Sequence, residues 1–373
     1  MNDELQIMNY MNLALKLAAK GIGSVEPNPA VGTVIARNGQ IIGKGFHKKF
    51  GGQHAEINAL ADCKVKGHNP AGATMYVTLE PCCHFGKTPP CADAIIEAGI
   101  AKVVVAVVDP APHCAGRGIE KLRAAGIEVE VGMCEKEAAL LNAPFFKFTK
   151  TNLPWIILKW AQSIDGKLAY ANPKVDGQWL SNEQSRTDAH DLRRRVQAIL
   201  VGINTVIADD PLLTPRPAKG KTPLRVVLDV ELRMPHESKL LQTASESPVL
   251  VITSHHSLKY REEVAHHIIK QSGQVLPLPM ADGQCDLNAL LAELGKRGIQ
   301  QILVEGGPTV LASFLKQNLA DEVCVYIAPK ILGSAGAASI AEAMAQVANA
   351  LNLDNVTVKN FDSDICLSGM IIR

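Results

Sequence analysis

The sequence has few aromatic residues, no excess of either charge and no long apolar run. Phe, Trp and Tyr make up 4% of the 373 residues, and 38 basic against 37 acidic side chains leave a formal net charge of +1. Proteins that bind nucleic acid through its phosphates carry a basic excess, so this balance disfavours a nucleic-acid substrate. No apolar run approaches the roughly 20 residues that span a bilayer, so we expect no membrane partner.

The N-terminus also lacks the features of a secretory signal. Asp3 and Glu4 stand where a signal peptide needs basic residues, and a helical pattern follows over residues 4–20. The sequence therefore predicts a cytoplasmic protein. In that compartment its nine cysteines should be mostly reduced thiols. Most of them are isolated, but Cys82, Cys83 and Cys91 are clustered.

Helical and strand patterns alternate over two stretches of the chain. A hairpin is expected around Asn38-Gly39, followed by three strand-to-helix units up to residue 142, which predict a largely parallel sheet covered by helices. The segment around Lys147–Trp155 breaks the alternation, so we place a domain boundary there, with domains 1–147 and 148–373. A second α/β pattern follows, with strands expected near 155–161, 197–203, 224–229, 248–254, 301–307 and 322–329. Helices are expected near 182–195, 286–297 and 309–318, and two C-terminal strands at a sheet edge.

Three residues in the first domain match the ligands of a catalytic zinc ion. His54 begins one predicted helix, and Cys82 and Cys91 flank the loop between a strand and the next helix. A catalytic zinc takes three imidazole or thiolate ligands and leaves the fourth position open. All three residues lie at carboxyl ends of strands or amino ends of helices, where α/β proteins build their sites. We therefore expect one Zn²⁺ per chain.

Glu56, two residues after His54, favours a catalytic site over a structural one. Hydrolytic deamination needs a carboxylate that moves protons between a zinc-activated water and the leaving ammonia. His-x-Glu followed by Pro-Cys-x-x-Cys is the known signature of nucleobase deaminases. This chain has eight residues between the cysteines where that signature has two. The alternative is a closed structural site in which Cys83 or His84 is the fourth ligand.

These motifs resemble those of the bifunctional riboflavin-biosynthesis deaminase–reductases. The resemblance rests on HAE (54–56) and TLEPCCHFGKTPPC (78–91), and continues through PNPAVG, DPAPHCAGRG, KWAQSIDGK, ADDPLLTPR, ILVEGGPT and YIAPKILG, so that it covers nearly the whole chain. It implies a cytidine-deaminase-like three-layer α/β/α domain followed by a dihydrofolate-reductase-like α/β domain. It implies the zinc ligands His54, Cys82 and Cys91, the catalytic Glu56, and substrate contacts at Asn28, His47, His84, Lys87 and Thr88.

The second half contains a candidate nucleotide site. Glu305-Gly306-Gly307-Pro308-Thr309 closes a predicted strand and opens a helix, where glycine backbone N–H groups can approach a phosphate. The resemblance implies NADPH as the cofactor, with contacts at Ala161, Trp179, Thr205, Asp209, Val230, Gly307, Pro308, Thr309, Val310, Leu311, Ala312 and Ser313. It implies substrate contacts at Lys159, Gly177, Arg193, Leu213, Arg216 and Glu305.

The charged members of this set suit a phosphorylated ribose. Arg193 and Arg216 are able to form bidentate contacts with a 5-phosphate, although Arg193 also fits a solvated helix face. Lys159 lies within an apolar run, where a lysine is costly to bury unless it is paired, so a site is favoured there. With Asp209, Lys159 is expected to bracket the ribose carbon that accepts hydride. Gly177 replaces a serine found in many relatives, which makes the substrate contacts around residue 177 harder to predict.

The resemblance implies a two-step enzyme of riboflavin synthesis. The first domain would deaminate 2,5-diamino-6-ribosylamino-4(3H)-pyrimidinone 5′-phosphate, and the second would reduce the ribose of the product to a ribityl chain. We expect a homo-oligomer with a small-molecule substrate. Two rivals stay open: a nucleic-acid or free-nucleotide deaminase with a non-functional second domain, and a non-catalytic zinc-binding protein.

Overall fold

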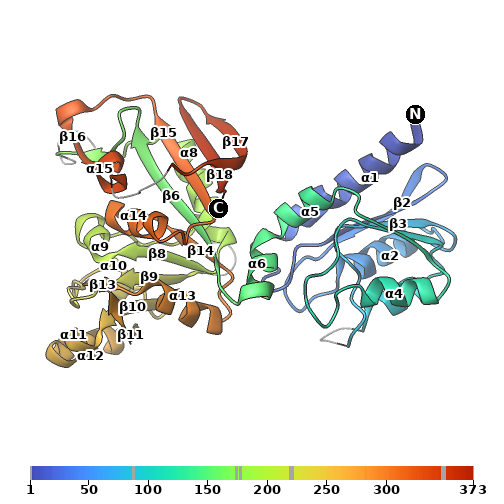
Figure 1. The fold of residues 1–373 in the computed structure, drawn as a ribbon, viewed down its shortest axis with the longest axis horizontal. Coiled ribbons are helices and arrows are strands. Elements are labelled where there is room, and N and C mark those ends of the chain that lie inside the picture. Colours follow the sequence, from blue (N-terminus) through green and yellow to red (C-terminus); the bar gives the residue numbers. More distant parts are fainter. Residues whose placement is uncertain are drawn as a thin grey trace. The chain divides into compact units, whose positions relative to one another are not determined.

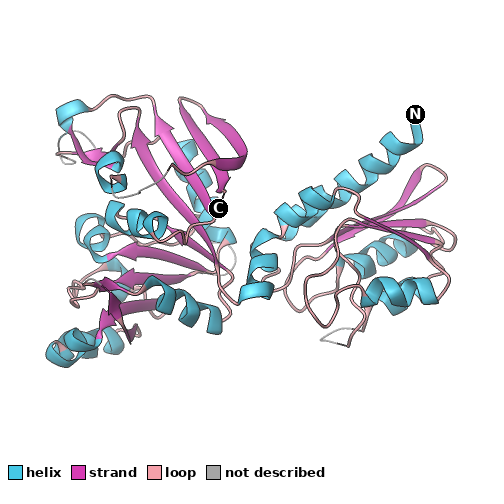
Figure 2. Ribbon diagram, viewed as in Figure 1, coloured by secondary structure: helices cyan, strands magenta, loops and turns pink. Residues whose placement is uncertain are grey.

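The chain consists of two compact α/β units, Met1–Asn152 and Leu153–Arg373 (Figure 1). The computed structural model describes residues 2–85, 89–172, 175, 179–217, 222–281, 283–345 and 350–372. Within these ranges, none of the helices combines the length and the apolar character that crossing a membrane requires. Helices and strands alternate in both units, as Figure 2 shows.

The N-terminal unit is a three-layer α/β/α sandwich, as predicted. Its sheet has the order β2-β1-β3-β4-β5, in which β3, β4 and β5 run parallel and β1 pairs antiparallel with both neighbours. The expected hairpin turns at Asn38 and Gly39, whose positive φ angles of 52° and 76° suit a tight two-residue loop. The strands are β1 (Gly32–Arg37), β2 (Gln40–Phe46), β3 (Thr74–Val77), β4 (Lys102–Val105) and β5 (Glu128–Val131).

Apolar stripes on the helices cover both faces of this sheet. One buried cluster joins the sheet to α2 (Ala55–Val65), α3 (Cys91–Glu97) and α4 (Arg117–Ala124). A second cluster on the opposite face joins it to α1 (Asn2–Ala18) and α5 (Glu135–Leu141). The amino ends of α2 and α3 both follow loops that leave the sheet, and this arrangement positions the zinc-binding residues.

The segment that was expected to interrupt the alternation is a helix. Residues Ala143–Thr151 form α6, which begins with Pro144 in its first turn and ends at Asn152 in a left-handed conformation. Proline fits the first turn of a helix because its missing N–H needs no partner there. The predicted boundary between residues 147 and 148 lies inside α6, whereas the two compact units divide after Asn152.

The C-terminal unit is built on a nine-stranded sheet of order β11-β10-β9-β8-β14-β6-β15-β18-β17. All its strands except the last two run parallel, and β18 and β17 add antiparallel strands at one edge, as predicted. The strands are β6 (Trp155–Ser163), β8 (Ala198–Gly202), β9 (Leu224–Leu228), β10 (Val249–Ser254), β11 (Gln274–Leu278), β14 (Gln301–Val304), β15 (Glu322–Ala328), β17 (Leu353–Phe361) and β18 (Asp364–Ile371).

The three predicted helices of this unit are present, as α8 (Glu183–Arg195), α13 (Leu287–Lys296) and α14 (Pro308–Lys316). Helices α13 and α14 pack against the sheet through its main apolar cluster. The sequence analysis did not predict the edge strand β11 or helix α12 (Glu262–Lys270), although α12 is as long as the predicted α14. It also missed elements that contain too few residues to show a period. They are α9 (Ile203–Asp209), α10 (Lys239–Gln242), α11 (His255–Tyr260), α15 (Ile340–Met344), and the two-stranded sheets β7 (Lys167–Tyr170) with β16 (Gly336–Ser339) and β12 (Met280–Ala281) with β13 (Gln284–Cys285).

Arg225 on β9 is a fully buried cation held by neutral acceptors. Its guanidinium donates to the Thr243 hydroxyl at 2.8 Å and to backbone carbonyls of Leu212, Leu240, Thr243 and Ser247. Burial lowers the pKa of Arg225 to about 10. In the described part of the chain no carboxylate pairs with it. The carbonyl shell therefore offsets the cost of burying this charge and joins β9 to the loop before it and to the segment from α10 to β10.

We expect Arg225→Met to lower the free energy of unfolding of the C-terminal unit by about 3 kcal/mol, because several buried carbonyls would lose their donor. Tryptophan fluorescence during urea unfolding reports on this unit alone, since all 3 tryptophans, Trp155, Trp160 and Trp179, lie in it. Arg297→Met on the exposed end of α13 is the control, with a change within about 0.5 kcal/mol. Equal unfolding curves for the two variants would contradict the role given to Arg225.

Candidate functional site

The three predicted zinc ligands lie together in the N-terminal unit. His54 is the residue before α2, Cys82 follows β3, and Cys91 is the first residue of α3. The His54 Nδ1 atom lies 3.6 Å from Cys82 Sγ and 3.3 Å from Cys91 Sγ. Tetrahedral zinc ligands at their usual bond lengths lie roughly 3.5 Å apart, so this donor set fits zinc.

The described residues gather only these three ligands within 4.8 Å of one another. The Cys83 thiol instead faces the carbonyl of His113 at 4.0 Å, and the His84 ring packs edge-on against the His113 ring. Neither candidate for a fourth ligand joins the cluster. A three-ligand set leaves a position for water, which is the arrangement of catalytic zinc sites.

Hydrogen bonds to the Cys82 sulfur favour the thiolate form of this residue. The Cys91 thiol and the His54 ring, both in contact with the Cys82 sulfur, lower the pKa of the Cys82 thiol to about 4. The backbone N–H of Cys91 also donates to that sulfur at 3.3 Å. The thiolate is the form that coordinates metal, so the negatively charged Cys82 sulfur favours binding of a cation.

Glu56 lies in the first turn of α2 and is buried, with 3% of its surface exposed. Burial raises the pKa of its carboxyl to about 7, and the neighbouring Cys82 adds to this rise. A carboxyl group that titrates near neutral pH is suited both to accept and to donate a proton. This environment is the one that the proposed proton transfer requires.

A cavity of about 400 Å³ opens over the cluster, and three predicted substrate residues line it: Asn28, His47 and His84. His47 Nδ1 lies 3.0 Å from the carbonyl of Gln53, so this nitrogen carries the proton. Its Nε2 is then the acceptor that faces the Asn28 amide at 3.2 Å. Burial lowers the pKa of His47, which favours the neutral ring. The predicted contacts Lys87 and Thr88 lie outside the described residues.

The sequence analysis missed the carboxylate that shapes this pocket. Glu80, buried in the segment that follows β3, accepts the backbone N–H groups of Asp109 and Gly116 on one oxygen and of Gly118 and Ile119 on the other, at 2.8–3.3 Å. A side chain at Gly118 would lie 2.0 Å from the carbonyl of Pro81, so only glycine fits there. The loop that carries the pocket residues Asp109 and His113 is therefore fixed to β3. The sequence signal for Glu80 was an acidic residue immediately after an apolar run that is expected to form a strand.

The second candidate site lies at the carboxyl ends of β9, β8, β14 and β6, which are consecutive in the sheet. Glu305, directly after β14, receives two hydrogen bonds from Arg193 of α8, Nε to Oε1 at 2.6 Å and Nη2 to Oε2 at 2.8 Å. The Lys159 ammonium of β6 lies 3.5 Å from the same carboxylate. Burial raises the pKa of Glu305, but the charges of Arg193 and Lys159 outweigh it and bring the value to about 2.

Lys159 is therefore paired, as its apolar surroundings require. Its ammonium also lies 5.7 Å from the centre of the Tyr326 ring, and the Tyr326 hydroxyl donates to Asp188 of α8 at 2.6 Å. Arg193 lies against Glu305 and does not belong to a purely solvated helix face. Burial lowers the pKa of His190, and the charges of Arg193 and Arg216 lower it further. Arg216 is therefore near enough to His190 on α8 to act on its charge. Leu213 is buried in the loop that precedes Arg216.

The predicted nucleotide cradle is a tight turn between β14 and α14. Gly307 is the residue before α14, and a side chain there would meet the Thr205 hydroxyl of α9 at 3.4 Å. The Gly202 N–H at the end of β8 donates to Gly306 O at 2.8 Å. The bare backbone and the adjacent hydroxyl fit a phosphate group. Of the helix residues predicted to contact the cofactor, Leu311 is buried in the core. Pro308, Thr309, Val310, Ala312 and Ser313 are at least partly accessible.

Other predicted cofactor contacts are more dispersed. Asp209 is exposed at the end of α9, and among the described residues it contacts neither Lys159 nor Glu305. Ala161 lies two residues beyond Lys159 on β6, and Trp179 is 55% exposed beneath the Arg186 guanidinium. Gly177 lies outside the described residues.

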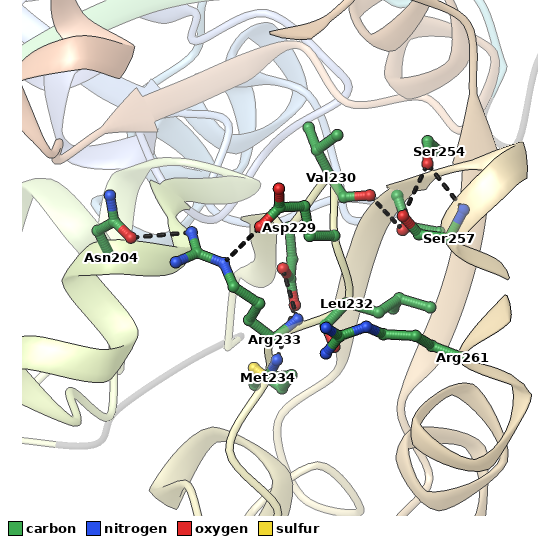
Figure 3. A network of polar contacts seen from close by, with 11 residues as sticks. Asn204, Asp229, Val230, Leu232, Arg233, Met234, Ser254, Ser257 and Arg261 are labelled. Atoms are coloured by element: carbon green, nitrogen blue, oxygen red, sulfur yellow. Dashed lines mark hydrogen bonds and ion pairs between the residues drawn. The ribbon is translucent and has the colours of Figure 1, made fainter. Parts of the chain in front are cut away.

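Val230 lies in a polar network after β9, which Figure 3 shows. Asp229 accepts the backbone N–H groups of Arg233 and Met234 at 2.8 Å, and the Arg233 guanidinium donates to the Asn204 side chain of α9 at 2.9 Å. The Thr253 hydroxyl donates to Val230 O at 3.1 Å. These contacts join the carboxyl ends of β9 and β10 to α9 and fix the loop beside the glycine turn.

Comparison with known proteins covers both units. Residues 5–107 match the family model for the cytidine and deoxycytidylate deaminase zinc-binding region, and residues 154–367 match the RibD C-terminal domain. The riboflavin biosynthesis protein RibD of Aquifex aeolicus is 49% identical over 327 residues, 87% of each chain. That of Escherichia coli is 39% identical over 372 residues, 96% of this chain and 97% of the relative.

Solved structures agree over the full length. Acinetobacter baumannii RibD (form 1) superimposes with a TM-score of 0.83 at 38% identity, covering 99% of both chains. The Thermotoga maritima diaminohydroxyphosphoribosylaminopyrimidine deaminase/5-amino-6-(5-phosphoribosylamino)uracil reductase gives 0.82 at 35% identity, also covering 99% of both. A zinc-binding deaminase unit and a reductase unit in one chain, matched from end to end, place this protein in the RibD family of bifunctional riboflavin-biosynthesis enzymes.

Proposed function

We propose that the N-terminal unit removes the ring amine of 2,5-diamino-6-ribosylamino-4(3H)-pyrimidinone 5′-phosphate. We propose that the C-terminal unit then reduces the ribose of the product to a ribityl chain with NADPH. The Thermotoga maritima relative is named for these two activities. The observation that carries the proposal is the buried Glu56 beside a three-ligand cluster, because a structural metal site needs no free carboxylate.

In the deaminase reaction, His54, Cys82 and Cys91 would hold the zinc ion. When bound, zinc would supply the Lewis acidity that makes a water molecule nucleophilic near neutral pH. Glu56 would accept one proton of the attacking water and donate it to the ring nitrogen, and would then pass the remaining hydroxyl proton to the amine, which leaves as ammonia. Asn28 and His47 orient the pyrimidine in the cavity, with the Asn28 amide held by His47 Nε2. His84 at the cavity wall is placed to approach the substrate's polar groups.

In the reductase reaction, NADPH supplies the hydride when it is bound at the glycine turn. Glu305 holds Lys159 and Arg193 at fixed positions. The Lys159 ammonium then stabilises negative charge that develops on the ribose oxygen as the open-chain form accepts hydride. Arg193 and Arg216 bind the 5-phosphate, and Asp209 approaches the cofactor from α9. The substrate contact at Gly177 and the cofactor contacts at Trp179 and Val230 stay predictions.

The two activities can be separated in one assay of the zinc-loaded protein. We expect the diaminopyrimidine substrate to release ammonia without NADPH, and the product to be reduced only when NADPH is added. Ammonia measured by a coupled assay and NADPH absorbance at about 340 nm follow the two steps. Ammonia release that requires NADPH, or no release at all, would contradict the proposed order.

We expect Cys91→Ala to lose both zinc and deaminase activity. The variant keeps only two ligands, too few to hold zinc in a tetrahedral site with an open position. Metal analysis of the purified protein should give one zinc per wild-type chain and well below half of that in the variant, with ammonia release reduced at least about a hundredfold. Cys63→Ala, at a buried cysteine of α2 outside the cluster, is the matched control. A variant at residue 91 that keeps a full zinc complement would show that the third ligand is another residue.

We also propose a cytoplasmic location and a homo-oligomeric assembly. The location rests on the cysteines, all of which are free thiols, as expected in a reducing compartment. Light scattering of the purified chain measures the assembly directly. A mass of 40.0 kDa across the working concentration range would contradict the oligomer.

A further inference from the structure

Two cysteines of the C-terminal unit lie in contact on neighbouring strands near one edge of its sheet. The Cys324 sulfur of β15 and the Cys366 sulfur of β18 are 3.4 Å apart, and both are free thiols. Their exposed fractions are 4% and 3%. The sequence predicts ordinary isolated thiols at both positions and gives no sign of this pair, because 41 residues separate them in the chain.

The strand register places the two thiols as diagonal neighbours. Cys324 pairs with Ser368, and Cys366 pairs with Tyr326, so both cysteine side chains project from the same face of the antiparallel pair. A disulfide has a sulfur–sulfur bond of about 2.05 Å, so the two atoms need to approach by only about 1.4 Å. Diagonal neighbours on a ladder have Cα atoms about 7–8 Å apart, which is more than a disulfide usually spans, so the bond requires side-chain rotation together with a small approach of β15 and β18.

One of the two thiols donates a hydrogen bond to the other, and the geometry allows either sulfur to be the donor. Accepting this hydrogen bond lowers the pKa of a thiol and favours its thiolate, which is the form that reacts with peroxides and disulfides. Either cysteine can therefore react first, and its neighbour completes the bond.

The pair lies beside the reductase residues described above. Cys324 pairs directly with Lys159 across the β15–β6 ladder, so their side chains share one face of the sheet. Tyr326, the direct partner of Cys366, carries the hydroxyl that donates to Asp188 and the ring beneath the Lys159 ammonium. A bond between the sulfurs would therefore change the packing immediately beneath Lys159.

We propose that Cys324 and Cys366 form a reversible disulfide in the folded protein on reaction with a peroxide, and that this bond slows the reductase. One of the two cysteines attacks the peroxide oxygen as a thiolate to give a sulfenic acid, and the thiol of the other displaces the sulfur-bound oxygen as water. In sum, two thiols and one hydrogen peroxide give one disulfide and two waters. A small dithiol reverses the reaction by exchange. The effect on rate rests on the proposed role of Lys159, whereas bond formation does not.

Treatment of the zinc-loaded full-length protein with hydrogen peroxide tests the proposal. After the free thiols are alkylated, peptide mass mapping should find residues 324 and 366 joined, with the loss of two hydrogens. Reduction of the deaminated substrate should slow at least about fivefold and recover with dithiothreitol. Cys366→Ala should keep its untreated rate and its rate after peroxide, and Cys324→Ala provides a second variant. Cys285→Ala, at an isolated buried cysteine of the same unit, should respond as the wild type does.

Each other outcome is decisive. If residues 324 and 366 remain alkylatable after peroxide treatment and unfolding, the proposed disulfide does not form. If the bond forms and the reductase rate is unchanged, the coupling to Lys159 is wrong. An untreated chain that never oxidises NADPH would instead contradict the proposed function and leave the mass result valid. Tryptophan fluorescence confirms that each variant is folded before the rates are compared.

Discussion

Glu56→Gln should retain zinc and lose deamination by at least about a hundredfold, the usual size of a general acid–base contribution. Glutamine has nearly the same shape as glutamate, so the first turn of α2 and the position of His54 should be preserved. The amide cannot accept the proton of the attacking water at any working pH. Metal analysis and ammonia release, measured on the same preparation, separate loss of the proton carrier from loss of the metal.

Glu120→Gln on the exposed face of α4 is the matched control, since it removes a carboxylate from the same unit at a distance from the cavity. It should release ammonia at the wild-type rate. The reduction step, assayed with the deaminated intermediate supplied, should be unchanged in both variants. Ammonia release near the wild-type rate by zinc-loaded Glu56→Gln protein would rule out Glu56 as the proton carrier.

Lys159→Met should lower the reductase rate at least about a hundredfold and leave ammonia release unchanged. Removing one preorganised charge that stabilises a developing oxyanion typically has an effect of this size. The variant should still fold, because Glu305 keeps its two hydrogen bonds to Arg193 and no buried carboxylate is left unpaired. NADPH oxidation measured with the supplied intermediate gives the rate.

Lys296→Met at the exposed end of α13 is the control for the loss of a lysine. The deaminated intermediate should accumulate in Lys159→Met reactions that contain both the first substrate and NADPH. A fall in ammonia release equal to the fall in NADPH oxidation would mean that the two steps share a site. A reductase rate within about threefold of the wild type would remove Lys159 from the chemistry.

The order of elements and the metal cluster could be predicted because their signals are local. Alternating patterns defined the main strands, and Asn38-Gly39 marked the hairpin. His54, Cys82 and Cys91 stood out because zinc accepts few ligand types and these lie where α/β folds build sites. The segment before Trp155 was read as a break because its run of phenylalanines follows no clear period, although Pro144 fits the first turn of α6.

Contacts between distant segments could not be predicted from these patterns. The carbonyl shell of Arg225 and the bond from Tyr326 to Asp188 depend on which strands become neighbours in the sheet. The sequence also gave no measure of burial, which is what brings the pKa of Glu56 to about 7. The resemblance named Lys159 and Glu305 as substrate contacts but did not show that they pair with each other.

The four backbone hydrogen bonds accepted by Glu80 have a consequence for how this pocket can change over generations. They hold both ends of the segment between Asp109 and Gly118. Ala111 and Cys114 are buried in the core, so only the exposed residues Pro112, His113 and Ala115 need not support the fold. Selection can replace these three residues and alter which molecules enter, while the metal cluster stays intact. A library randomised at residues 112, 113 and 115 should yield mostly folded, zinc-loaded proteins, whereas one randomised at residue 80 should not.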